Sequence, residues 1–152
     1  MPNKDAIFQQ LFLRETQGVP IVDRESVSLN HTHEQDYEKW LAEKRDFTIE
    51  EIDESHWIKS CTAGYITEVI FKESGSLTEF TLFERLKTVG HWQLKEGLVY
   101  VSIFKGENQY DFVIVGNANV HIHSAIEYKN DEIHSYLKLA QTRVPYGLSQ
   151  SH

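Results

Sequence analysis

The feature that most constrains this chain is a change of hydrophobic period at Gly64, after which apolar residues recur at every second position to about residue 140. Side chains of a strand alternate between two faces, so a period of two predicts β-structure. Strands are predicted at residues 65–73, 77–86, 88–95, 98–105, 110–116, 120–128 and 133–140. Most breaks between them, such as KEG and KNDE, are short and have the composition of tight hairpin turns. Because a parallel crossover needs about a dozen residues or more, the short links predict an antiparallel meander of about seven strands.

Several predicted strands are apolar on both faces, a pattern that a sheet with one wet face does not explain. In residues 98–105, for example, Tyr100 and Phe104 oppose Val99 and Val101. A closed barrel with a filled or ligand-holding interior, covered outside by helices or by a second subunit, accounts for this pattern and removes exposed strand edges. The predicted fold class is therefore mainly β, an up-and-down barrel preceded by helices, and a homodimer is one expectation.

The residues before the strand region have a helical or irregular pattern instead. Two residue pairs have the spacing of a capping box, Thr32 with Gln35 and Thr48 with Glu51. In this motif the side chain of each residue accepts a hydrogen bond from the backbone N–H of the other. Helices are predicted near residues 33–45 and 49–54. The first of them carries an apolar stripe that faces a core.

Length and charge narrow the classes of function. The chain has 152 residues and is predicted to form a single domain, 1–152, with a helical part at 1–56, a barrel at 62–140 and a tail at 141–152. Its 23 acidic residues exceed its 15 Lys and Arg residues, giving a net charge of −8. This charge argues against a nucleic acid or an anionic membrane surface as the partner.

Cysteine usage and the N-terminal segment bear on location. Cys61 is the single cysteine, so no intrachain disulfide can form. We recognise no secretory signal, and no stretch approaches the roughly 20 apolar residues of a membrane span. The expected location is the cytoplasm.

The segment GHWQLKEGLVYVSI, residues 90–103, resembles the hairpin of lipocalin-like and streptavidin-like barrels, the calycin group. Those proteins carry a Gly-x-Trp near a strand start, matched here by Gly90 and Trp92, with Glu96 and Gly97 as the following turn. The resemblance implies an up-and-down barrel in which the tryptophan packs across one end and the glycine permits close backbone approach. It also implies one small apolar or amphipathic ligand, whose identity the fold does not specify.

The segment VHIHSAIEY, residues 120–128, is the main candidate for polar chemistry. On a strand, His121, His123 and Glu127 share one face. Two imidazoles and a carboxylate suit a divalent metal ion, so a metal site is one hypothesis. Polar residues that line a lumen or an outer surface are the alternative, and no cofactor is predicted.

A second His-x-His pair, His31 and His33, lies just before the predicted helix at 33–45. Polar residues are common at a helix start, so we interpret this pair as part of a loop and N-cap region. Nothing in the sequence requires the two His-x-His pairs to come together in one four-histidine site.

Aromatic residues form 12% of the chain and concentrate in the predicted strands, which indicates either core packing or an aromatic-lined pocket. We predict a small-molecule-binding protein of unknown specificity. Its predicted wall is Trp92, Tyr100 and Phe112, with His121 and His123 as polar contacts if their face is inward.

Two other classes of function stay open at this point. Helices before a curved sheet also suit an NTF2-like isomerase, dehydratase or cyclase that uses a His/Glu acid–base pair. A protein-interaction module with a filled barrel is the third class.

Overall fold

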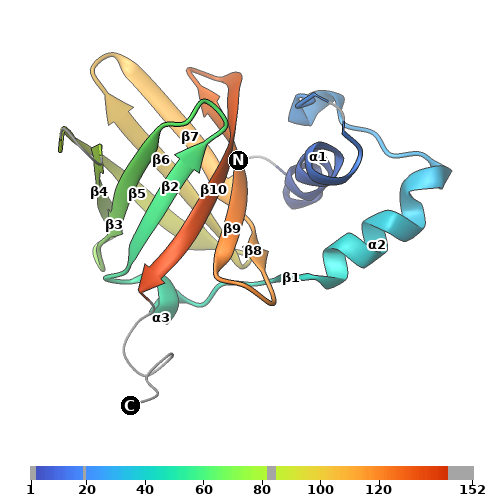
Figure 1. The fold of residues 1–152 in the computed structure, drawn as a ribbon, viewed down its shortest axis with the longest axis horizontal. Helices are drawn as coiled ribbons and strands as arrows, with labels where there is room; N and C mark the ends of the chain where they lie inside the picture. The colour runs from blue at the N-terminus through green and yellow to red at the C-terminus, as the bar shows by residue number, and fades with distance from the viewer. Residues whose placement is uncertain (1–2, 19, 82–84, 144–152) are drawn as a thin grey trace.

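The computed structural model describes residues 3–18, 20–81 and 85–143. Its centre is a closed antiparallel barrel with the strand order β10-β2-β3-β4-β5-β6-β7-β9 (Figure 1), which confirms the predicted fold class. The barrel strands are β2 (His56–Cys61), β3 (Ile66–Phe71), β4 (Ser76–Thr81), β5 (Lys87–Lys95), β6 (Leu98–Lys105), β7 (Asn108–Ile114), β9 (Ile122–Lys129) and β10 (Glu132–Arg143). Two short strands, β1 (Lys44–Arg45) and β8 (Gly116–Asn117), pair with each other beside the barrel.

Strand β2 is the element that the sequence pattern missed. It falls between the predicted helical part and the predicted barrel, and it closes the ring by pairing with both β3 and β10. Its interior positions are occupied by Trp57, Lys59 and Cys61, so a lysine interrupts the apolar alternation that marks the other strands. The barrel therefore has one strand more than the meander of about seven predicted from hydrophobic period.

Other boundaries also differ from the predictions. The predicted strand 77–86 ends at Thr81, and residues 82–84 lie outside the described residues. The predicted tail begins inside β10, which continues through Arg143, and residues 144–152 are not described.

The helices precede the barrel. They are α1 (Lys4–Thr16), α2 (Glu34–Ala42) and the short α3 (Ile49–Ile52), with 3-10 turns η1 (Arg24–Ser26) and η2 (His31–His33). The capping box of Thr48 and Glu51 is present at the start of α3. The capping box predicted for Thr32 and Gln35 is instead made by Asn30 and His33, because η2 forms one turn before α2. No helix within the described ranges is long and apolar enough to cross a membrane.

Helix α1 lies against one side of the barrel, beside β9, and α2 packs against α1 farther from the barrel (Figure 1). Leu11 and Phe12 of α1 and Trp40 of α2 are buried in one apolar cluster with outward-facing side chains of β6, β7, β9 and β10. Burial of each such side chain stabilises the fold by about 1.5–3 kcal/mol. The helices thus explain why several strands are apolar on both faces, and the homodimer stays a prediction.

A buried polar contact ties these helices to the barrel. Glu15 of α1 accepts hydrogen bonds from Trp40 Nε1 at 2.9 Å and from the Tyr136 hydroxyl at 2.5 Å. The ammonium of Lys44 lies 3.6 Å from Glu15 Oε1. Burial raises the pKa of Glu15, but these hydrogen bonds and the charge of Lys44 outweigh it and hold the pKa below its ordinary value. Glu15 is therefore a charged junction between α1, α2 and β10.

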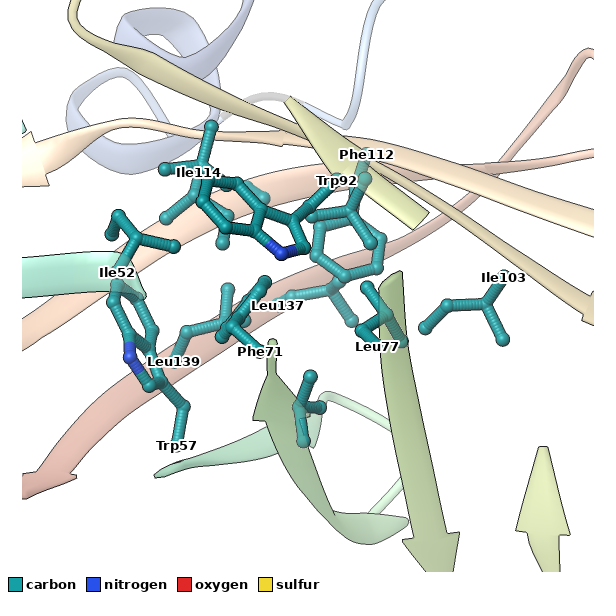
Figure 2. Close-up of a cluster of buried hydrophobic side chains, with 14 of the residues drawn as sticks. Ile52, Trp57, Phe71, Leu77, Trp92, Ile103, Phe112, Ile114, Leu137 and Leu139 are labelled. Atoms are coloured by element: carbon teal, nitrogen blue, oxygen red, sulfur yellow. The ribbon is translucent and has the colours of Figure 1, made fainter. Parts of the chain in front are cut away.

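One half of the barrel interior is filled with apolar side chains, and α3 closes that end (Figures 1 and 2). Phe71 packs edge-on against Trp57, with ring centroids 5.4 Å apart, and against Trp92, at 5.9 Å. Trp92 Nε1 donates a hydrogen bond to the Lys72 carbonyl at 2.8 Å, which fixes the ring toward the closed end.

Gly90 permits a close approach between β5 and β6. A Cβ atom at this position would lie only 2.0 Å from the Ser102 carbonyl oxygen. The close approach of these two strands therefore requires a glycine at position 90.

Candidate functional site

A cavity of about 560 Å³ occupies the end of the barrel opposite α3. It lies where β2, β4, β6 and β9 end and where β3, β7 and β10 begin, so its lining comes from seven strands. The lining residues include Lys59, Cys61, Tyr65, Ile66, Thr67, Glu79, Thr81, Ile103, Lys105, Tyr110, Glu127, His134 and Leu137. A cavity of this size is within the range of roughly 300–1,000 Å³ found for small-molecule sites.

The floor of the cavity contains an ion pair. The ammonium of Lys59 on β2 lies 2.6 Å from Glu79 Oε2 on β4, and the two side chains are 12% and 8% exposed. Thr67 on the intervening strand donates a hydrogen bond to the same carboxylate oxygen at 2.6 Å, and Thr88 donates to Oε1 at 3.1 Å. Alternation along β2, β3 and β4 points these side chains inward together.

The contacts of Glu79 set its charge state. Burial raises the pKa of the carboxyl, but the adjacent Lys59 ammonium and the hydrogen bonds from Lys59, Thr67 and Thr88 outweigh burial. The pKa of Glu79 is therefore below its ordinary value of 4.5, and the group is a carboxylate at neutral pH.

A second carboxylate, Glu127 on β9, is paired less completely. It is 5% exposed, yet Lys59 Nζ is 3.6 Å from its Oε2 and His134 Nε2 is 3.9 Å from its Oε1. The hydroxyl of Ser135 donates to Oε1 at 3.2 Å. All three distances exceed the 2.6 Å contacts made by Glu79. Lys59 is thus bound mainly to Glu79, and Glu127 retains acceptor capacity toward the cavity.

Aromatic and apolar groups surround this charged floor. Phe112 lies beside Lys59, whose ammonium is 5.3 Å from the ring centroid. Tyr110 meets His134 edge-on with centroids 5.7 Å apart. Ile103 and Leu137 complete an apolar wall. The arrangement combines a polar anchor with apolar sides, which is the general plan of small-molecule sites.

The structure separates the three residues predicted as an aromatic wall. Trp92 and Phe112 point into the barrel and belong to its interior core. Tyr100 does not, because its register partners are Gln93 and Val113 on the outer face. It lines an outer groove of about 300 Å³ next to Arg24, so the inward orientation predicted for Tyr100 is corrected.

The side chain of His123 points into the barrel, but it lies in the closed half and not in the cavity. Its Nε2 is 2.6 Å from Gln141 Oε1, and its Nδ1 accepts the Asn117 backbone N–H at 2.9 Å. Its ring packs against Phe47 and Trp57, with centroids 4.8 and 5.5 Å away. Burial lowers the pKa of His123 from 6.5 to about 4. The imidazole is neutral at pH 7, and both of its nitrogens are engaged within the fold.

The predicted metal set is not brought together. His121 is exposed at the closed end, with Nδ1 3.3 Å from Gln141 Oε1, whereas Glu127 lines the cavity at the other end. Across residues 3–18, 20–81 and 85–143, no group of three His, Cys, Asp or Glu side chains is placed to hold a metal ion.

The earlier His-x-His pair lies near the start of α2. His33 Nδ1 accepts the Asn30 N–H at 3.3 Å, and exposed His31 pairs with Glu34 at the same distance. This agrees with its interpretation as an N-cap region.

Sequence reasoning missed the ion pair on the floor of the cavity. Glu79 is one of several glutamates in predicted strands, and parity alone does not say which face is inward when both faces are buried. Lys59 carried no signal, because its strand was not recognised. The one usable signal was the position of Lys59 two residues after Trp57, which places both side chains on one face of a strand.

Comparison of the chain with protein-family models, with curated proteins and with solved structures finds no match. The barrel and its cavity are therefore the basis for functional inference.

Proposed function

We propose that this protein binds a small amphipathic molecule in the cavity at the open end of its barrel. The observation that carries the proposal is a void of about 560 Å³ whose floor holds three buried charged side chains, Lys59, Glu79 and Glu127. Protein interiors normally pack as densely as organic crystals, so a barrel that served only as a filled scaffold would not retain such a space. The closed half of the same barrel is filled by Trp57, Phe71 and their neighbours, as expected for a barrel interior that only supports the fold.

The calycin resemblance supports the same proposal. The chain forms a closed up-and-down barrel with Gly90 at a close strand approach and Trp92 packed toward one end. In the calycin group the Gly-x-Trp lies on the first strand, and here it lies on β5. We infer a calycin-like architecture, in which a ligand within the barrel is the common use of the fold.

The contacts within the cavity favour binding over turnover. His134 and Glu127 form the His/Glu pair at this site, but at 3.9 Å they make no hydrogen bond through which one would orient the other. Lys59 is an ammonium bound to Glu79, and a protonated amine is not a nucleophile.

Fluorescence titration with N-phenyl-1-naphthylamine, a neutral apolar probe that brightens in apolar surroundings, tests the proposal. Cys61 lines the cavity and is partly buried, so Cys61→Phe places a ring in the void while Cys61→Ser preserves it. We expect saturable binding to the unaltered chain and to Cys61→Ser, and affinity at least about tenfold lower in Cys61→Phe. Exposed His121 at the closed end provides a second control, His121→Ala, with unchanged binding.

Two results overturn the proposed function. One is the absence of saturable probe binding to the unaltered chain. The other is equal affinity in Cys61→Phe and Cys61→Ser when both retain cooperative thermal unfolding, since the probe would then bind elsewhere.

A further inference from the structure

We infer that the bound molecule carries a protonated amine, or another cationic hydrogen-bond donor, which pairs with Glu127. This inference rests on the proposed function and assigns a chemical class to its ligand. The starting point is the charge of the cavity floor. Two carboxylates share one ammonium there, and that ammonium lies 2.6 Å from Glu79 but 3.6 Å from Glu127.

Because Glu127 is buried, its longer distance from Lys59 leaves its charge poorly compensated. Its side chain is 7% exposed, so solvent replaces few of the contacts that a carboxylate needs. Its one hydrogen-bond donor in the described residues is the neutral hydroxyl of Ser135, at 3.2 Å. A buried carboxylate is stabilised by a close, charged donor, and a ligand amine in the cavity supplies one.

The other charged groups around the cavity do not reverse this preference. Lys105 lies at the mouth and is exposed, where water and salt screen its charge. His134 is 44% exposed and stands 3.9 Å from Glu127, farther than a hydrogen bond. An anionic ligand group that reached the floor would meet Glu79 and Glu127 at low dielectric, where repulsion between like charges is strong.

The walls define the remainder of the ligand. Tyr110 presents an aromatic ring, and Ile103 and Leu137 present aliphatic surface in the same cavity as Glu127. These groups suit a flat or apolar body. The structure therefore points to an amine attached to an aromatic or apolar body.

A matched series of competitors tests this class of ligand. Tryptamine, tryptophol and indole-3-acetate share one ring system and differ in a cationic, neutral or anionic end group. Each is titrated against N-phenyl-1-naphthylamine bound to the full chain. We expect tryptamine to displace the probe at a concentration about tenfold lower than tryptophol, with indole-3-acetate weakest, as for a buried charge-assisted hydrogen bond.

The variant Glu127→Gln tests the residue assignment. The amide keeps the shape of the side chain and removes its charge, so the advantage of tryptamine over tryptophol is expected to fall to within about twofold. Exposed Glu132, in the strand that follows, provides the matched control, and Glu132→Gln is expected to keep the full advantage. The order of the three competitors on the unaltered chain requires no variant, so it stands whether or not Glu127→Gln folds.

The outcomes separate this inference from the proposed function. Equal or stronger displacement by tryptophol or indole-3-acetate overturns the amine class while probe binding keeps the cavity as a binding site. An undiminished tryptamine advantage in folded Glu127→Gln overturns the role of Glu127. Failure of the probe itself to bind overturns the proposed function.

Discussion

Lys59 and Glu79 meet inside the barrel from strands that are not neighbours, with Nζ 2.6 Å from Oε2 and β3 lying between them. The pair connects β2, the strand that completes the ring, to β4 across the intervening β3. Thr67 on β3 donates to the same carboxylate, so three successive strands contribute to one polar contact. These side chains therefore contribute to the stability of the barrel and form the floor of the proposed ligand site.

Replacement of Lys59 by methionine is expected to destabilise the barrel. Methionine fills similar volume but leaves Glu79 and Glu127 buried without a cation, a change that costs about 3 kcal/mol in comparable sites. Urea denaturation at neutral pH measures the loss, and exposed Lys87→Met is the control, with a change below about 0.5 kcal/mol. A loss below about 1 kcal/mol in Lys59→Met would mean that water in the cavity solvates the carboxylates.

Stability is expected to depend on pH through His123. Its folded pKa of about 4 lies below the ordinary value of 6.5, so the unfolded chain binds the proton more readily. The stabilisation from neutral His123 is complete above about pH 6.5 and is lost as pH falls through about 4, with about 2 kcal/mol lost between pH 7 and pH 5.

Urea denaturation at the two pH values, in matched histidine variants, checks this prediction. His123→Gln removes the titrating group and is expected to flatten the pH dependence. His121→Gln alters an exposed histidine two residues away and is expected to preserve it. The pKa values of Glu15, Glu51 and Glu79 are lowered from 4.5, so these carboxyls change stability mainly below about pH 4.5. Their contribution between pH 5 and pH 7 is therefore small. Equal slopes in the two variants would contradict the prediction.

Gly90→Ala is expected to weaken the pairing of β5 with β6. The added methyl group would lie 2.0 Å from the Ser102 carbonyl oxygen, and backbone cannot move aside as a flexible side chain can. We expect a loss of about 2–3 kcal/mol, seen as a lower thermal midpoint. Gly106→Asn is the control: Gly106 has a φ of 62° and open space around it, and asparagine tolerates that conformation. Similar thermal midpoints for the two variants would rule out the steric explanation.

Glu15→Ala is expected to loosen the helices from the barrel. The change leaves Trp40 Nε1 and the Tyr136 hydroxyl without their common acceptor, at a cost of about 2 kcal/mol. Hydrogen exchange should accelerate in α1 and α2 more than in the barrel strands, because the helices depend on this junction. Glu38→Ala, at an exposed position of α2, should leave exchange unchanged. Uniform acceleration across helices and strands would instead indicate that the whole fold is weakened.

The sequence predicted the barrel because period and turn chemistry agree over most of its length. Residues 98–105 were assigned with the bounds that β6 has, since KEG and GENQ delimit a strongly apolar strand. Strand β2 was not predicted because Lys59 occupies an interior position, where a hydrophobic period requires an apolar side chain. The chain departs from the pattern at the strand that carries the candidate site.

The candidate site was less predictable than the fold. Period assigns residues to two faces but does not say which face is interior when helices cover the outside, and Tyr100 was placed on the wrong side for this reason. The partners of Glu79 and Glu127 depend on the stagger of strands around the ring, which a single sequence does not encode in readable form. His123 and Glu127 share a strand face as predicted, yet the length of that strand separates them into opposite halves of the barrel.

The pairing of β2 with β10 also governs how the protein can be made. Ser60 in β2 lies opposite Lys138 in β10, which is synthesised on the order of eighty residues later. During translation, the edge of β2 that pairs with β10 has no partner strand until β10 is made. The ring therefore cannot form until nearly all of the described chain has left the ribosome. We therefore expect closure of the ring to be a late, long-range step that is slower than hairpin formation, and the open chain before it to be prone to association with other chains.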